Sequence, residues 1–180
     1  MQEHIKVPQD RIGVIIGVEG NVKKVIEEKT GCKMSVDSES GSVIIESEAE
    51  PIKALKASET IKAIARGFSP DKAFKLLDNE DLMLDIIDLS NISDSPADLT
   101  RIKGRIIGKA GKTREVIEQM AGVKLSVYGK TIGMIGDPEQ LTTARAAIDM
   151  LLDGAPHGAV YSFLEKRRRE LKRSQFESIQ

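Results

Sequence analysis

The apolar positions of this chain fall into two similar series. Each series closes on residues spaced three or four apart, as on one face of a helix. These are Ala54, Ala57, Ile61, Ile64 and Phe68 in the first series and Leu141, Ala144, Ile148, Leu151 and Ala155 in the second. Alternation over residues 33–37 and 123–128 predicts strands before those helices. Each series therefore predicts strand, helix, glycine loop, helix, strand, strand, helix, which is an α+β arrangement.

An internal repeat supports this division. When residues 11–36 are set over residues 102–127, 12 of the 26 positions are identical. Gly31 and Gly122 occupy the same place in the two copies, after the second helix, where a left-handed glycine ends a helix without steric cost. The two copies are therefore expected to fold alike.

Three segments follow from the repeat. Residues 1–80 are predicted to form a first unit with a connecting helix, residues 81–155 a second unit, and residues 156–180 a C-terminal basic helix. Pro51 and Pro138 mark the start of the closing helices, where a missing N–H costs nothing. A unit of about 70 residues has a marginal core by itself. We therefore expect the two units to pack against each other and to extend a shared sheet.

Both glycine loops carry the motif Ile-Ile-Gly-x-x-Gly, at residues 15–20 and 106–111. Between two helices this motif resembles that of a KH domain, whose loop clamps the backbone of about four unpaired nucleotides. Glycine permits a sugar-phosphate backbone to approach the loop amides closely. The resemblance implies two tandem type I KH domains of β-α-α-β-β-α topology. The alternative is a scaffold in which both loops are only tight turns.

The charge of the chain is unevenly distributed. The formal net charge is -1, yet residues 10–31 carry a net charge of zero and residues 101–122 a net charge of +4. The first loop holds Val18 and Glu19 where a lysine or arginine would attract phosphate. Because each neutralised phosphate releases counterions, the second copy should supply most of the salt-dependent affinity for a nucleic acid.

The candidate RNA-binding residues lie mainly in the second copy. They are Arg101, Lys103, Arg105, Ile106, Ile107, Gly108, Lys109, Ala110, Gly111, Lys112 and Arg114. A secondary set in the first copy comprises Arg11, Ile16, Gly17, Gly20, Lys23 and Lys24. Lys109 is the first choice for a phosphate contact, and the isoleucines are expected to line an apolar groove for the bases. The basic residues of segment 166–173 form either an electrostatic arm or a solvated helix face.

Other function classes have little support. Aromatic residues make up 3% of the chain, too few for an RNA-binding sheet that stacks bases. Residues 108–113 end in Gly-Lys-Thr, but a P-loop requires glycine at the position of Ile106. His4 and His157 are the only histidines and neither has a ligand-spaced partner. We therefore predict no enzyme activity, no metal and no cofactor.

The setting of the protein is predicted from its single cysteine and its hydropathy. Cys32 alone precludes an internal disulfide, which favours a reducing, cytoplasmic environment. No apolar run approaches the roughly 20 residues of a membrane span, so no membrane association is expected.

The chain as a whole, and residues 99–172 most closely, resembles the archaeal KH-domain proteins of the Dim/Pno family of ribosome-assembly factors. The resemblance implies a factor that binds the single-stranded 3′ end of small-subunit (16S) ribosomal RNA and assists pre-rRNA processing and small-subunit biogenesis. It also implies the endonuclease Nob and the alpha subunit of translation initiation factor two as partners. Eukaryotic members tend to have lost the first loop, whereas Gly17 and Gly20 are present here. A general single-stranded nucleic-acid module, or a protein-interaction scaffold, is the alternative.

Overall fold

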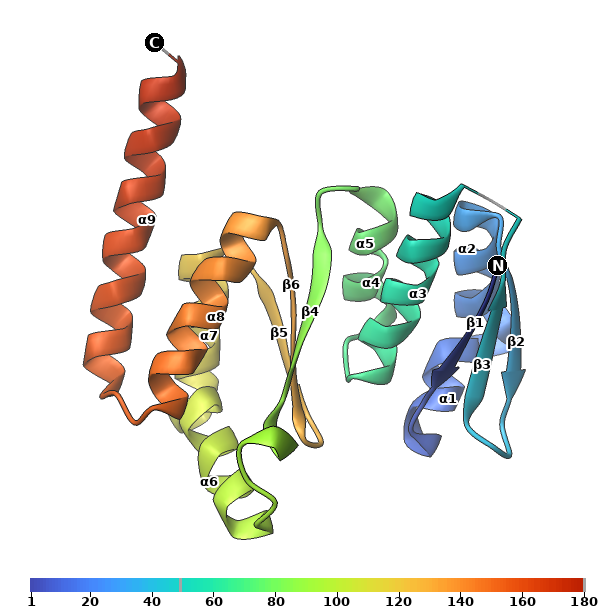
Figure 1. The fold of residues 1–180 in the computed structure, drawn as a ribbon, viewed down its shortest axis with the longest axis horizontal. Helices are drawn as coiled ribbons and strands as arrows, with labels where there is room; N and C mark the ends of the chain where they lie inside the picture. The colour runs from blue at the N-terminus through green and yellow to red at the C-terminus, as the bar shows by residue number, and fades with distance from the viewer. Residues whose placement is uncertain (49, 180) are drawn as a thin grey trace. The chain divides into compact units, whose positions relative to one another are not determined.

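The computed structural model describes residues 1–48 and 50–179 (Figure 1). The chain divides into two compact units, Met1–Leu84 and Asp85–Gln180. A strand that begins at Met83 crosses this division.

Unit 1 contains β1 (Gln2–Lys6), α1 (Gln9–Ile16), the 3-10 turn η1 (Val18–Gly20), α2 (Asn21–Thr30), β2 (Lys33–Asp37), β3 (Ser42–Glu46) and α3 (Pro51–Ala65), followed by α4 (Pro70–Ala73) and α5 (Lys75–Asp78). Its strands form an antiparallel sheet in the order β1-β3-β2. Ile5 pairs with Val43, and Met34 pairs with Ile45. The single connecting helix expected in residues 1–80 is divided into α4 and α5, which meet at Phe74.

Unit 2 repeats this order. It contains β4 (Met83–Asp88), the turn η2 (Leu89–Asn91), α6 (Pro96–Ile107), the turn η3 (Lys109–Gly111), α7 (Lys112–Ala121), β5 (Lys124–Tyr128), β6 (Thr131–Gly136), α8 (Pro138–Leu152) and α9 (His157–Ile179). The sheet order is β4-β6-β5, equivalent to that of unit 1. In each unit the first three long helices lie on one face of the sheet (Figure 1). The predicted β-α-α-β-β-α topology is confirmed for both copies.

The prediction that the two units extend a shared sheet is wrong. The strands of the described residues form two separate three-stranded sheets, one for each copy of the repeat. The first strand of each copy pairs with that copy's own last strand, so each sheet is completed locally. A shared sheet would require an edge strand of one unit to hydrogen-bond with an edge strand of the other, and the residue pattern within one unit does not specify that pairing.

The helix boundaries follow the chemistry of the sequence. Gly31 and Gly122 end α2 and α7 with φ of 73° and 77°. Asp137 caps α8 in a capping box with Gln140, directly before Pro138. These local signals explain why the predicted starts and ends lie within a few residues of the observed ones.

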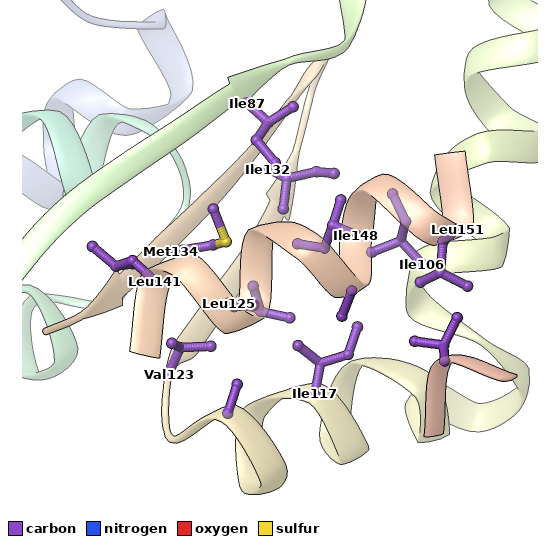
Figure 2. Packing of buried hydrophobic residues seen from close by; sticks show 14 of the residues in the cluster. Ile87, Ile106, Ile117, Val123, Leu125, Ile132, Met134, Leu141, Ile148 and Leu151 are labelled. Atoms are coloured by element: carbon purple, nitrogen blue, oxygen red, sulfur yellow. The ribbon is translucent and has the colours of Figure 1, made fainter. Parts of the chain in front are cut away.

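The helices on both sides of the glycine loop of unit 2 are anchored in the hydrophobic core of that unit. Figure 2 shows Ile106 from α6, Ile117 from α7, Ile132 and Met134 from β6 and Ile148 from α8 in one apolar cluster. All five side chains are completely buried. Burial of each such side chain stabilises the fold by ~1.5–3 kcal/mol. Because Ile106 precedes the loop and Ile117 follows it, the core fixes both ends of the loop.

No helix in residues 1–48 and 50–179 is long and apolar enough to span a membrane.

Candidate nucleic-acid interface

The two glycine loops have the same backbone conformation. Gly17 and Gly108 have φ/ψ of 78°/175° and 75°/174°, and Gly20 and Gly111 have 74°/14° and 75°/12°. Between them, Glu19 and Ala110 adopt left-handed conformations with φ of 55° and 54°. A non-glycine residue in that region costs on the order of 1 kcal/mol. Both copies therefore hold the same strained loop.

The two glycines of each loop serve different needs. A Cβ added at Gly108 would lie 2.2 Å from Thr113 Oγ1 and 2.8 Å from its backbone nitrogen, and one at Gly17 would lie 2.5 Å from Val22 Cγ2. These first glycines are required by the close contact between loop and following helix. A Cβ at Gly111 would meet only Arg114, 4.0 Å away, so this side of the loop is open to a ligand.

Two of the basic candidates in unit 2 are exposed and unengaged. Lys109 and Lys112 flank the open side of the loop, and within the described residues neither side chain has a hydrogen-bond or ion-pair partner. Arg114 lies 3.8 Å from Glu118 in a partly exposed pair, which solvent and salt weaken. The loop of unit 2 thus presents free positive charge beside open backbone.

Two further candidates are engaged with protein groups. Arg101 Nη2 donates to Asp98 Oδ1 at 2.7 Å, and this hydrogen bond holds the pKa of Asp98 below its usual value. Lys103 Nζ donates to the carbonyl oxygen of Gly129 in the β5–β6 turn at 3.0 Å. Both side chains would have to exchange these partners to contact a phosphate.

An arginine in each unit ties the first helix to the end of the closing helix. Arg105 Nη2 donates to Ala155 O at 2.5 Å, and Arg11 donates to Ile64 O and to Phe68 O, both at 2.8 Å. Phe68 and Ala155 are equivalent in the repeat, but Arg11 and Arg105 are not, being one helical turn apart after alignment. A cation at a helix C-terminus also interacts favourably with the helix dipole. The structure thus gives both arginines a part in holding the fold.

The isoleucine pairs are divided between core and surface. Ile106 and Ile15 are completely buried, while Ile107 and Ile16 are half-buried beside the loops. Only the second isoleucine of each pair can line a surface groove in this conformation.

The first loop differs from the second in its side chains. Val18 is 85% exposed and Glu19 is exposed next to it. Lys23 lies 3.8 Å from Glu27, whereas Lys24 is exposed on the same helix. An apolar and an acidic side chain therefore occupy the place of Lys109 and Ala110.

Contacts from α9 to the two helices that flank the second loop were not predicted from the sequence. His157 Nε2 lies 3.0 Å from Arg105 O on α6, and the Tyr161 hydroxyl lies 3.0 Å from Thr113 Oγ1 on α7. The two rings are also neighbours, with centroids 6.3 Å apart. The first turns of α9 therefore hold the helices on both sides of the loop. In the sequence, the only sign of these contacts is that His157 and Tyr161 are four residues apart, which places both rings on one side of a helix.

This fold and these paired loops define a protein with two type I KH domains. A family model described as "Eukaryotic type KH-domain (KH-domain type I)" matches residues 83–169, and one described as "KH domain" matches residues 2–63. The KH domain-containing protein MJ0443 of Methanocaldococcus jannaschii is 43% identical over 178 residues, which cover 97% of this chain and 78% of that protein.

A second relative and a solved structure show which family of KH-domain proteins the chain belongs to. The pre-rRNA-processing protein PNO1 of Candida albicans is 33% identical over 110 residues, covering 61% of this chain and 40% of that protein. The crystal structure of an a/eIF2alpha–aDim2p–rRNA complex from Pyrococcus horikoshii matches with 47% identity and a TM-score of 0.87, over 94% of this chain and 95% of the matched chain. The chain belongs to the archaeal Dim2/PNO1 family of KH-domain proteins. It spans less than half the length of the Candida relative.

Proposed function

We propose that this protein binds single-stranded RNA at the 3′ end of small-subunit (16S) ribosomal RNA and assists pre-rRNA processing and small-subunit biogenesis. The names of its relatives support this role, because one is a pre-rRNA-processing protein and another was crystallised with rRNA. The observation that carries the proposal is the second loop, where the side chains of Lys109 and Lys112 have no partner among the described residues and lie beside an open Gly111.

In this proposal the residues of the second copy divide into two roles. Gly108, Ala110 and Gly111 admit the sugar-phosphate backbone, and Lys109 and Lys112 contact its phosphates. Ile107 lines the groove beneath the bases. Arg114 adds long-range attraction, while Arg101, Lys103 and Arg105 position the loop through the contacts described above.

The first unit has a weaker place in this proposal. Its loop has the same backbone but presents Val18 and Glu19, and Arg11 is engaged with the end of α3. Gly17, Gly20, Lys23 and Lys24 would give at most a weak second contact. A protein-interaction scaffold is the alternative that the side chains of this loop favour.

Partners and setting follow from the same relatives. We propose that the chain binds the alpha subunit of initiation factor two, because the matched crystal structure contains a/eIF2alpha together with rRNA. The endonuclease Nob is proposed as a partner in pre-rRNA processing. In this role the chain is a non-enzymatic RNA-binding factor that acts where ribosomes are assembled, in the cytoplasm.

The test is a double substitution in the second loop, Lys109→Asp with Ala110→Asp. Aspartate tolerates the left-handed conformation at position 110, so the fold should persist. Two carboxylates would then face the phosphates. We expect fluorescence anisotropy with a 3′-end RNA to show near-complete loss of binding, while a shuffled RNA and a duplex bind weakly to the wild type.

The matched control is Val18→Asp with Glu19→Asp, which places the same side chains at the same backbone positions of the first loop. We expect the control to retain affinity for the 3′-end RNA. Unchanged affinity in a folded Lys109→Asp, Ala110→Asp variant would refute the role of the second loop.

A further inference from the structure

The outer half of α9 carries a face that the fold does not use. Val160 and Leu164 pack the start of the helix into the core and are completely buried. Beyond Leu171 every described side chain of the helix is exposed, and the helix extends past the rest of its unit (Figure 1, red). A short helix without tertiary contacts is marginal in water. We therefore expect this segment to be stabilised by binding a partner.

Four side chains define that face. Arg169, Lys172 and Arg173 precede Phe176 by seven, four and three residues, so all four lie on one side of the helix. We call them the α9 stripe. Phe176 is 64% exposed, in a chain with only four phenylalanines. The stripe lies on the side of the helix away from Val160 and Leu164.

The positive charges of the α9 stripe are not neutralised within the protein. In the part of the chain that the structure describes, the side chains of Arg169, Lys172 and Arg173 have no hydrogen-bond or ion-pair partner. Their neighbours differ, since Arg167 lies 3.3 Å from Glu170 and Arg168 contacts Met120 on α7. Glu165 lies one turn before Arg169 and Glu177 one turn after Arg173, and in the described residues neither forms an ion pair with the stripe.

We propose that the α9 stripe is a second contact for single-stranded RNA, outside the groove of the second loop. Cations that follow the backbone, together with an exposed aromatic ring on which a base stacks, are the chemistry of single-strand binding. Arg169, Lys172 and Arg173 contact phosphates, and Phe176 stacks on one base. The inference rests on the function proposed above, because it concerns the same RNA beyond the roughly four nucleotides that the loop holds.

The start of α9 places the stripe within reach of that RNA. Tyr161 is hydrogen-bonded to Thr113, two residues after the loop, and Arg168 contacts Met120 at the other end of α7. The helix thus leaves the loop alongside α7. At 1.5 Å per residue, Arg169 lies about 12 Å along the helix from Tyr161. A strand that leaves the groove can follow this path with its next nucleotides.

The experiment compares two RNAs by fluorescence anisotropy at several salt concentrations. One has four nucleotides, enough for the groove, and the other has twelve, with the same four at its centre. The cation variant combines Arg169→Gln, Lys172→Gln and Arg173→Gln. The matched control combines Lys53→Gln, Lys72→Gln and Lys75→Gln, three exposed lysines of unit 1. Glutamine preserves helix propensity, and circular dichroism checks the helix content.

We expect the cation variant to bind the twelve-nucleotide RNA more weakly and to lower its salt slope by up to about 2, given about 0.7 per neutralised phosphate. Its affinity for the four-nucleotide RNA should not change, and the control variant should change neither. Phe176→Ala should weaken binding of the longer RNA at least about five-fold.

Two results would overturn the inference while leaving the proposed function intact. One is unchanged binding of the longer RNA in both α9 variants, as expected if this face binds a protein. The other is an equal loss for both RNAs, which would reflect total charge. If the wild type binds neither RNA, the proposed function fails together with the inference.

Discussion

The two glycine loops share a backbone and differ in what they present to a ligand. Their glycine φ/ψ values agree within a few degrees, and both hold a non-glycine residue in the left-handed region. Yet one presents Val18 and Glu19 and the other Lys109 and Ala110. The geometry of such a loop is therefore set by its glycines and by the contact with the next helix. The chemistry is set separately, by the two residues between the glycines.

The largest effect on the free energy of unfolding is expected at the first glycine of each loop, where the two loops have the same backbone conformation. Gly108→Ala should destabilise unit 2 by about 3 kcal/mol, because the new Cβ would clash with Thr113 at a φ/ψ that only glycine tolerates. Gly17→Ala should act similarly on unit 1 through Val22. Gly111→Ala should cost only about 1 kcal/mol, for the left-handed φ alone. Urea unfolding measures all three.

Gly104→Ala is the control for these glycine substitutions. Gly104 lies inside α6, and a Cβ there would meet no atom within 4 Å in the described residues. This variant should be stabilised by up to about 1 kcal/mol, because alanine favours a helix over glycine. If Gly108→Ala and Gly104→Ala proved equally stable, the steric account of the loop would be wrong.

The second effect concerns the difference between the loops. Val18→Lys with Glu19→Ala gives the first loop the residues of the second on the same backbone. The measurement should be made in the background of Lys109→Asp with Ala110→Asp, so that unit 2 does not contribute. If chemistry alone separates the loops, adding these two substitutions should make the same background protein bind a single-stranded RNA about ten-fold more tightly, or ~1.4 kcal/mol. No gain in affinity would mean that unit 1 lacks the groove as well as the charge.

The sequence predicted what is encoded locally and missed what depends on distant partners. Glycines 31 and 122 and the prolines at 51 and 138 act on their own helix ends, so the elements of both units could be placed from the repeat. Arg105 reads as a phosphate ligand in the sequence, because nothing local reveals the carbonyl of Ala155, fifty residues away. The same holds for Arg11 and the end of α3.

The arrangement around α9 lay beyond the sequence for a related reason. A basic helix was expected over residues 156–180, close to the observed α9, but its contacts with the helices on both sides of the loop were not. His157 and Tyr161 become informative only when α9 is known to lie against α7. The sequence therefore predicted the loop of the candidate site, but it did not predict the contacts that support that loop.

The smallest expected effect comes from removing the hydrogen bond between Thr113 and Tyr161, through which α9 supports the loop of unit 2. Unit 1 has no equivalent of this bond at the matching position. Thr113 corresponds to Val22 in the repeat, so its hydroxyl has no counterpart in unit 1. Tyr161→Phe and Thr113→Val should each destabilise unit 2 by about 1 kcal/mol, because each leaves a polar partner unpaired. The double variant should lose little more than either single variant, since both polar groups are then gone. A double-mutant cycle by urea unfolding measures the coupling.

The same variants separate a positioning role from a purely structural one. If the hydrogen bond between Thr113 and Tyr161 holds the loop in its binding conformation, all three variants should also bind the four-nucleotide RNA two- to five-fold more weakly under conditions where they are fully folded. Affinity that stays at the wild-type value while stability falls would show that α9 supports the fold without tuning the loop. In that case the loop conformation would be fixed by Gly108 and the core residues Ile106 and Ile117 alone, as it is by their counterparts Gly17, Ile15 and Ile26 in unit 1.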